Sequence, residues 1–194
     1  MIAFLKGNFT LLTPTFVHID VQGVGYEVFI SLHTYAEIQG KTQGLLYTHF
    51  HIREDAHLLY GFATPAEKEM FLQLLGVNGV GASTARMMLS SLKPEEISRA
   101  IIQGNAKQLE AVKGIGKKSA ERIILELRDK LTKQSLDLNN SVSIGNTTET
   151  DALNALLALG IARPAAEVAL RKSMQQHPGS DKVEEIIKSA LKNL

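Results

Sequence analysis

The same short motif occurs twice, as Val77-Asn78-Gly79-Val80-Gly81 and, 35 residues later, as Val112-Lys113-Gly114-Ile115-Gly116. After two further residues each copy continues with a hydroxyl residue and an alanine, which are Thr84-Ala85 and Ser119-Ala120. The agreement extends to apolar residues on both sides and pairs Leu74 with Leu109, Met88 with Ile123 and Leu89 with Ile124. A match over a whole repeat unit seldom arises by chance, so we interpret the stretch as a duplicated helix, glycine hairpin and second helix.

A hairpin with glycines two positions apart, placed at a helix N-terminus, exposes several backbone N–H groups at once. The helix macrodipole adds partial positive charge at the same end, and such sites bind phosphate. A single Gly-x-Gly would be read as an ordinary turn, but two matching copies predict a surface that holds a nucleic-acid backbone without reading bases. The predicted phosphate-binding residues are Asn78, Gly79, Gly81, Ser83, Thr84, Lys113, Gly114, Gly116, Lys117, Lys118 and Arg122.

The two copies differ in charge. Lys117 and Lys118 lie in the first turn of the second helix, where the helix dipole disfavours cations, and a bound phosphate would offset that cost. Arg122 follows one turn later and is expected to reach the same DNA strand. In the first copy Ala82 and Ser83 stand in the two lysine positions. We therefore expect the second hairpin to contribute more of the electrostatic affinity.

The composition is that of an ordinary soluble protein, with 44% apolar and 21% charged residues. There is no cysteine, which excludes disulfides and thiolate metal sites. We expect neither a membrane span nor a signal peptide, and therefore a cytoplasmic protein, because long apolar runs and a basic N-terminal segment are both missing. Residues 64–133 hold 12 Lys/Arg and 8 Asp/Glu, whereas residues 1–63 hold 3 and 5, so the positive excess coincides with the hairpins.

Residues 1–63 are predicted to form β structure. The strand-like runs are Ile2 to Leu12, Phe16 to Val21, Tyr26 to Ile30, Leu45 to Ile52 and Leu58 to Phe62, with Gly23-Val24-Gly25 joining the second and third. Five or six short strands favour a small closed barrel over an open sheet with free edges. Glycines 7, 23, 25 and 44 would suit its corners.

Residues 64–131 are predicted to be helical, and residues 148–194 to form a separate small helical domain. Thr64-Pro65-Ala66-Glu67 has Thr at the N-cap, Pro at N1 and Glu at N3 of a helix. Residues 132–147, rich in Ser, Asn and Thr, are interpreted as a linker. Gly160 and Pro178-Gly179 divide the last segment into three helices. The apolar faces expected to pack together are, on the helix before the linker, Ala120, Ile123, Ile124, Leu127 and Leu131, and in the last segment Leu153, Leu156, Leu157, Leu159, Val183, Ile186, Ile187, Ala190 and Leu191.

The remaining motifs do not indicate catalysis. Gly40-Lys41-Thr42 and Gly116-Lys117-Lys118 both fail the P-loop pattern, and no nucleophile with a base stands out. We therefore predict a protein without catalytic residues or cofactor. His49 and His51 would share a strand face, but no third metal ligand is evident. Arg53-Glu54-Asp55-Ala56, taken from the residues alone, is an ordinary polar hairpin tip.

With the β segment before them and the helical segment after, the paired hairpins resemble the helix-hairpin-helix motifs of the RuvA family, the Holliday-junction recognition subunits of a branch-migration complex. The resemblance covers the whole chain in order and is most specific up to about residue 131. The residues that carry it are Gly23-Val24-Gly25-Tyr26-Glu27-Val28, Thr48-His49-Phe50, Arg53-Glu54-Asp55-Ala56, Leu58-Leu59-Tyr60-Gly61-Phe62, Asn78-Gly79-Val80-Gly81 and Gly114-Ile115-Gly116-Lys117-Lys118-Ser119-Ala120-Glu121-Arg122.

The resemblance implies an α+β multidomain fold: an N-terminal OB-fold β-barrel, a central tandem helix-hairpin-helix domain and a C-terminal three-helix (UBA-like) module. It implies a non-catalytic subunit that binds four-way DNA junctions without sequence specificity and holds them in an open square form. The partners it implies are the RuvB ATPase motor, which the subunit recruits and stimulates in recombination and DNA repair, the RuvC resolvase, and further copies of the chain in a homotetramer or in an octamer of two facing tetramers.

The resemblance also assigns roles to particular residues. The family's acidic pin maps onto Glu54 and Asp55, which would repel phosphates at the crossover and guide the strands, and this reverses the interpretation of the hairpin tip from residues alone. The residues expected to contact the motor are Leu156, Leu159, Gly160 and Ile161. The family's usual lysine early in the first hairpin's helix is missing, because Ala82 and Ser83 occupy that place.

Two other functions were weighed. A helix-hairpin-helix DNA repair enzyme, such as a glycosylase or a nuclease subunit, would need catalytic residues that the sequence does not offer. A single-strand-binding OB protein would stack bases on aromatic side chains, but aromatic residues make up only 6% of the chain and most fall at strand-like apolar positions.

Overall fold

The computed structural model describes residues 1–141, 148–176 and 182–193, and the chain divides into two compact units, residues 1–134 and 135–194. The strands of the first unit are β1 (Phe4–Leu12), β2 (Phe16–Val21), β3 (Val24–Ile30), β4 (Gln43–Ile52) and β5 (His57–Phe62). Its helices are α1 (Leu32–Ile38), α2 (Pro65–Leu75), α3 (Ala82–Ser91), α4 (Pro94–Ile102), α5 (Ala106–Glu110) and most of α6 (Lys117–Ser141). The helices of the second unit are α7 (Thr148–Ala158), α8 (Arg163–Gln176) and α9 (Val183–Lys192).

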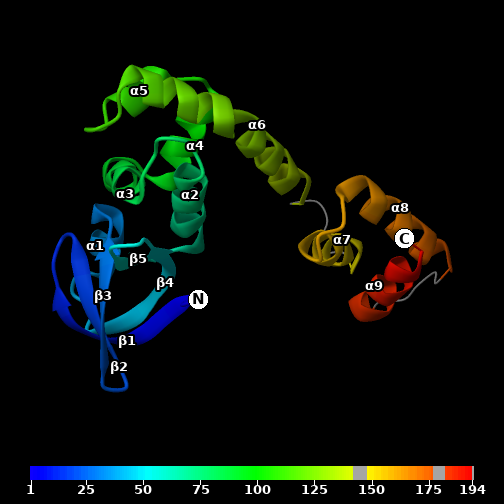
Figure 1. The fold of residues 1–194 in the computed structure, drawn as a ribbon, viewed down its shortest axis with the longest axis horizontal. Coiled ribbons are helices and arrows are strands. Elements are labelled where there is room, and N and C mark those ends of the chain that lie inside the picture. The colour runs from blue at the N-terminus through cyan, green and yellow to red at the C-terminus, as the bar shows by residue number, and fades with distance from the viewer. Residues whose placement is uncertain (142–147, 177–181, 194) are drawn as a thin grey trace. The chain divides into compact units, whose positions relative to one another are not determined.

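The five strands close into a barrel in the order β1-β2-β3-β5-β4, with β4 pairing back onto β1 (Figure 1). Neighbouring strands are antiparallel except β3 and β5, which are parallel. Closure removes the free edges that an open sheet would expose. The prediction of a small OB-type barrel is confirmed, and its apolar interior consists of Leu5, Val17, Ile19, Val28, Ile30, Ile38, Leu46 and Leu59.

Two of the predicted corner glycines lie where the strands pack closely. Gly7 on β1 pairs with Gly44 on β4. A Cβ at Gly7 would lie 2.1 Å from the carbonyl oxygen of Asp20, and one at Gly44 would lie 2.9 Å from the ring of Phe9. Gly7 has no room for a side chain because the obstacle is backbone, whereas a side chain at Gly44 would require the Phe9 ring to shift, so the glycine at position 7 is what lets β1 pass close to β2.

The connection between β2 and β3 is tighter than predicted. Val24 and Gly25 pair with Val21 and Asp20, so they belong to β3 and not to the turn. The turn itself is Gln22-Gly23, with φ of 54° and 88°. Two successive positive φ values define the type I′ turn that suits a two-residue hairpin.

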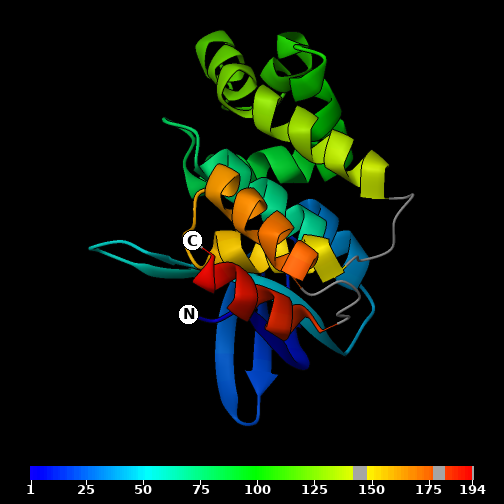
Figure 2. The same ribbon diagram turned by 90° about the vertical axis from the view of Figure 1, so that its right-hand side faces the viewer.

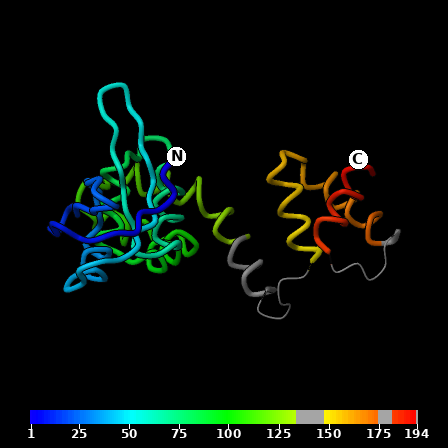
Figure 3. Tube along the Cα trace, turned by 90° about the horizontal axis from the view of Figure 1, so that it is seen from below, coloured from blue at the N-terminus to red at the C-terminus, as the bar shows by residue number. Residues whose placement is uncertain are grey.

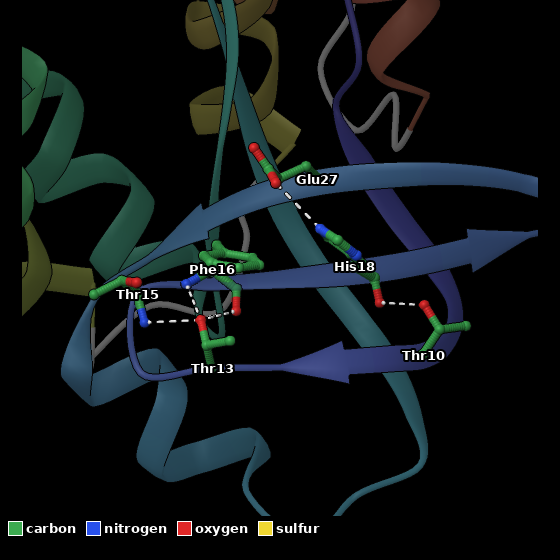
Figure 4. Close-up of polar contacts among 6 residues, drawn as sticks. All are labelled: Thr10, Thr13, Thr15, Phe16, His18 and Glu27. Carbon is green, nitrogen blue, oxygen red and sulfur yellow. Dashed lines mark hydrogen bonds and ion pairs between the residues drawn. The ribbon is translucent and has the colours of Figure 1, made fainter.

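Side-chain hydrogen bonds hold the first three strands together (Figure 4). In the β1–β2 turn, Thr13 Oγ1 donates to the carbonyl of Phe16 at 2.8 Å and accepts from its N–H at 3.0 Å. Further along, Thr10 Oγ1 donates to the carbonyl of His18 at 3.3 Å. His18 Nε2 lies 3.1 Å from Glu27 Oε2 on β3. These contacts tie β1 to β2 and β2 to β3 in this part of the barrel.

Helix α1 is an element that the sequence analysis does not predict. Ser31 caps it by accepting the N–H of Thr34 at 3.0 Å, and Gly40, with φ of 81°, follows it. The serine and the glycine are the signals that could have revealed it. The hydroxyl groups of Ser31 and Thr34 also donate hydrogen bonds to the buried carboxyl group of Glu67, and the bond from Thr34 is 2.6 Å long. Because Glu67 lies in the first turn of α2, where Thr64 caps the helix as predicted, this carboxyl group joins the barrel to the helices.

Helices α2 to α6 share one apolar core with the end of β5. The predicted apolar face of α6 is confirmed, since four of its five residues are buried and Ile124 is partly buried against the same core. The paired repeat residues Leu74 and Leu109 are both fully buried there. The duplicated stretch therefore folds as one helical domain.

Helix α6 continues past Leu131 to Ser141, whereas the sequence analysis has a linker begin at Thr132. The difference arises because residues 132–141 lack a regular apolar face, yet several of them, such as Lys, Gln and Leu, are good helix formers. Residues 142–147 of the predicted linker lie outside the described residues. Within the described ranges, none of the helices combines the length and apolarity that a membrane crossing requires.

The second unit is a three-helix domain with its own core. That core consists of Ala152, Leu156, Ala166, Ala169, Leu170, Ile186 and Ala190, with Leu153, Leu157, Val183 and Ile187 packed against it. Two residues predicted to join it do not, because Leu159 is 63% and Leu191 42% exposed. Gly160, with φ of 87°, separates α7 from α8 as predicted, while Pro178-Gly179 lies outside the described residues.

Candidate nucleic-acid interface

The first hairpin connects α2 to α3. Its N–H and C=O groups form a compact turn, in which Val80 N–H donates to the carbonyl of Val77 at 3.0 Å. Both valines are buried, and Gly79 between them has φ of 85°. Gly81 is the N-cap of α3 and gives it no side-chain cap, so no capping side chain occupies the first-turn N–H groups of α3.

The second hairpin repeats this geometry. Ile115 N–H donates to the carbonyl of Val112 at 3.0 Å, both side chains are buried, and Gly114 has φ of 92°. The following helix starts in the same way, because Ala120 N–H donates to the carbonyl of Gly116 at 3.0 Å, as Ala85 N–H does to Gly81 at 2.9 Å. The predicted pair of glycine hairpins, each at a helix N-terminus, is confirmed.

The crests of both hairpins are exposed, and the copies differ in the charge around them. Lys113, Lys117 and Lys118 are exposed at the second hairpin and the start of α6. In the first copy Ser83 is also exposed at the place of Lys118, but Ala82, at the place of Lys117, is buried. The first hairpin thus offers backbone N–H groups and hydroxyls, and the second adds three ammonium groups.

Arg122 and Glu126 lie on α6, after the second hairpin, but both contact the first hairpin. Arg122 Nη1 donates to the carbonyl oxygen of Asn78 at 3.2 Å. Asn78 N–H in turn donates to Glu126 Oε2 at 3.4 Å. The sequence analysis has Arg122 reach the same DNA strand as Lys118, which stays a prediction, and it does not single out Glu126.

The Arg53–Ala56 segment is the tip of the hairpin formed by β4 and β5, which projects from the barrel (Figures 2 and 3). The tip is closed by a hydrogen bond from Arg53 N–H to the carbonyl of Ala56 at 2.8 Å. Glu54 and Asp55 are exposed at the tip. Arg53 Nε lies 3.9 Å from Asp55 Oδ1, an exposed pair that contributes little stability. The two carboxylates are therefore available to a large ligand.

Two aromatic rings, those of His51 and Phe71, lie beside His49 at the base of this projecting hairpin. The His49 ring centre lies 5.9 Å from that of His51 and 5.7 Å from that of Phe71, both at tilted angles, and the His51 ring centre lies 6.1 Å from that of Tyr60. Burial, with smaller effects from His51 and Lys68, lowers the pKa of His49 below its ordinary value. No group of three or more His, Asp or Glu side chains within the described residues is arranged to hold a metal ion.

Helix α3 is fastened to the barrel by residues that the sequence analysis does not single out. Arg86 Nη1 donates to the carbonyl of Thr15 at 3.1 Å, and its guanidinium lies 5.3 Å from the centre of the Phe29 ring. Ser90 Oγ accepts the N–H of Leu32 at 3.1 Å. With the Glu67 network, these contacts fix the first hairpin relative to the barrel and its acidic tip.

The residues predicted to contact a motor lie at the end of α7. Leu159 and Gly160 are exposed there, and Ile161 is partly buried against the domain core. Leu156 is fully buried in that core, so we remove it from the predicted contact surface. The resemblance assigns both leucines to the contact, but Leu156 is buried in the domain core whereas Leu159 is exposed.

The comparisons with known proteins agree with this layout. Residues 1–61 match the family model "RuvA N terminal domain", residues 71–129 match "SAM-like Helix-hairpin-helix tandem", and residues 148–194 match "RuvA, C-terminal domain". The chain is 46% identical over 194 residues to the "Holliday junction branch migration complex subunit RuvA" of Christiangramia forsetii, with 100% of both chains covered. It is 42% identical over 197 residues to the protein of the same name from Cytophaga hutchinsonii, with 99% of each chain covered. The chain therefore belongs to the RuvA family.

Proposed function

We propose that this protein binds four-way DNA junctions without sequence specificity, holds them in an open square form and recruits a RuvB ATPase motor for branch migration in recombination and DNA repair. The observation that carries the proposal is the pair of equivalent hairpins in one unit with the projecting acidic tip. Each hairpin presents first-turn N–H groups, which bind phosphate regardless of base sequence. A crossover that must move through any sequence requires contacts of this kind.

Two hairpins alone would hold any duplex, so the preference for a junction needs a further element. We propose that four copies assemble around the crossover, one for each arm, as a tetramer or as two facing tetramers. The exposed carboxylates of Glu54 and Asp55 then surround the centre and repel the phosphates there. Attraction along the arms and repulsion at the centre together favour an open junction over a continuous duplex.

We propose that the three-helix domain, residues 148–194, is the docking site of the motor, with Leu159, Gly160 and Ile161 at or near the contact. The exposure of Leu159 supports this, because a large apolar side chain outside its own core is available to a partner. The ATP hydrolysis that drives migration is then the motor's, and the chain itself acts without catalysis, in the cytoplasm. RuvC resolvase is proposed as a further partner on the same junction.

The proposal is tested by measuring the affinity of the full chain for a synthetic four-way junction, a linear duplex and a single strand at equal salt. We expect the junction to bind most tightly, and binding to weaken steeply with salt. Equal affinity for junction and duplex would refute the junction function. Cleavage of any of the three by the pure protein would instead favour the alternative of a helix-hairpin-helix repair enzyme.

A further inference from the structure

The backbone of the first hairpin is held by two side chains of a helix that follows the second hairpin. Arg122 Nη1 binds the carbonyl of Asn78 at 3.2 Å, and Glu126 Oε2 accepts its N–H at 3.4 Å. Arg122 and Glu126 are four residues apart and share one face of α6. We refer to Arg122, Asn78 and Glu126 as the hairpin tether, since both polar backbone groups of Asn78 are bound.

The tether links the two hairpins directly. Helix α6 begins at Lys117, immediately after the second hairpin, so the residues on its first three turns have fixed positions relative to that hairpin. The tether extends this fixed relation to a residue 44 positions from Arg122 and 48 from Glu126 in the sequence. The guanidinium also packs at the crest, because a Cβ on Gly79 would lie 3.5 Å from Arg122 Nη1.

Among the residues that the structure describes, the tether has no counterpart in the other copy of the duplication: α6 contacts the first hairpin in this way, but α3 does not contact the second hairpin with a matching pair. The residues of α3 that match Arg122 and Glu126 by the 35-residue spacing are Met87 and Ser91. Neither is charged, and Ser91 Oγ donates to the carbonyl of Met87 at 3.0 Å within its own helix. The charged pair is therefore directed at the hairpin that lacks lysines and depends on its backbone N–H groups.

We propose that Arg122 and Glu126 are positioning residues for DNA binding, which hold the first hairpin at the spacing from the second that lets both bind phosphates of one DNA arm. The proposal rests on the proposed function. A loop that already has its bound conformation loses less conformational entropy when the ligand arrives. In this arrangement the Arg122 guanidinium binds the Asn78 carbonyl in place of a phosphate. Glu126 supports phosphate binding although it is itself negative.

Glu126 gives the proposal a test of sign. Simple electrostatics predicts that removing a carboxylate near a phosphate site strengthens DNA binding, whereas loss of the tether weakens it. The matched control is Glu121, which is also an exposed glutamate on α6. We expect Glu126→Ala to bind a four-way junction about fivefold more weakly than the wild type, corresponding to the loss of one hydrogen-bonded support. Glu121→Ala should bind as tightly as the wild type or more tightly.

Arg122 is tested by the salt dependence of the same binding. Losing a phosphate contact lowers the slope of log K against log salt by about 0.9 per contact. Arg122→Gln should therefore weaken binding while leaving that slope unchanged. Glu126→Gln keeps an acceptor oxygen for the Asn78 N–H, so it should bind as tightly as the wild type, unlike Glu126→Ala. Thermal unfolding of each variant, followed by circular dichroism, verifies that it is folded.

The proposal is overturned if Glu126→Ala binds as tightly as Glu121→Ala, or if Arg122→Gln reduces the salt slope as a lost phosphate contact does. These results are distinct from failure of the proposed function. If the wild type binds junction and duplex equally, the junction function fails. If the wild type prefers the junction but Glu126→Ala matches its control, only the tether is refuted.

Discussion

Placing a lysine at Ser83 should give the first hairpin the charge that the second already has. Ser83 matches Lys118 in the duplication, and both positions are exposed in the first turn of the helix after a hairpin. The two hairpins have matching internal backbone hydrogen bonds and a matching positive-φ glycine, so a lysine at Ser83 should meet DNA as Lys118 does. Ser83→Lys is therefore expected to add one phosphate contact per chain.

The size of the effect follows from counterion release. One contact changes the slope of log K against log salt by about 0.9, so four chains on four arms would change it by about 3.6. Between 50 and 200 mM salt, that difference alters the loss of affinity by on the order of 100-fold. Without DNA, the new lysine lies at the unfavourable end of the helix dipole and should cost about 0.5 kcal/mol of stability.

The assay is fluorescence anisotropy of a labelled four-way junction at several salt concentrations. Lys118→Gln is the reciprocal variant and should lower the slope by the same amount that Ser83→Lys raises it. Gln39→Lys, at the exposed C-cap of α1, adds the same charge on an element that carries neither hairpin and serves as the control. An unchanged slope for Ser83→Lys, or a change no larger than that of the control, would refute the equivalence of the two hairpins.

Four further changes test other parts of the molecule. Glu54→Lys with Asp55→Lys should retain or tighten junction binding but impair motor-driven migration, and normal migration would refute the pin role. Deleting residues 148–194 should leave junction binding intact and abolish stimulation of the motor's ATPase; stimulation by the shortened chain would show that the dock lies elsewhere. Glu67→Ala leaves its buried hydrogen-bond donors unpaired and should lower the free energy of unfolding by about 3 kcal/mol, measured by urea denaturation at unchanged m-value. Folding lowers the pKa of His49, so its ring binds a proton more readily in the unfolded chain than in the folded one. The wild type should therefore lose stability as the pH falls below about 6.5, and His49→Leu should lose less. Equal acid sensitivity of the two proteins would contradict this.

The parts of the fold that the sequence predicts are those with a local pattern. Each hairpin is specified by a glycine that needs positive φ between two apolar residues, and the start of α2 by Thr64 and the proline after it. The barrel strands alternate apolar and polar residues, which locates them but not their turns. For that reason the β2–β3 turn is misplaced by two residues while the strands themselves are found.

The parts that the sequence does not predict depend on contacts between distant residues. Ser31 and Glu67 are 36 positions apart, and Arg122 and Asn78 are 44 apart. A local sequence pattern, which covers one helix or strand, therefore contains neither pair. Arg122 was assigned to DNA from its place beside Lys118, and only the fold shows that its guanidinium meets the first hairpin. Leu156 and Leu159 look alike on the sequence, and only the structure shows that Leu156 is buried in the domain core while Leu159, just after the end of α7, is 63% exposed.

The central claim is that copies of this chain hold a junction open and square through paired hairpins and a repelling centre. Its most direct test is the geometry of the bound DNA, measured by energy transfer between dyes on the arm ends of a four-way junction in magnesium. We expect the protein to make all adjacent arm pairs equivalent and both diagonal pairs equivalent, whatever the sequence at the crossover. Transfer efficiencies that keep the unequal pattern of the free, stacked junction would contradict the claim.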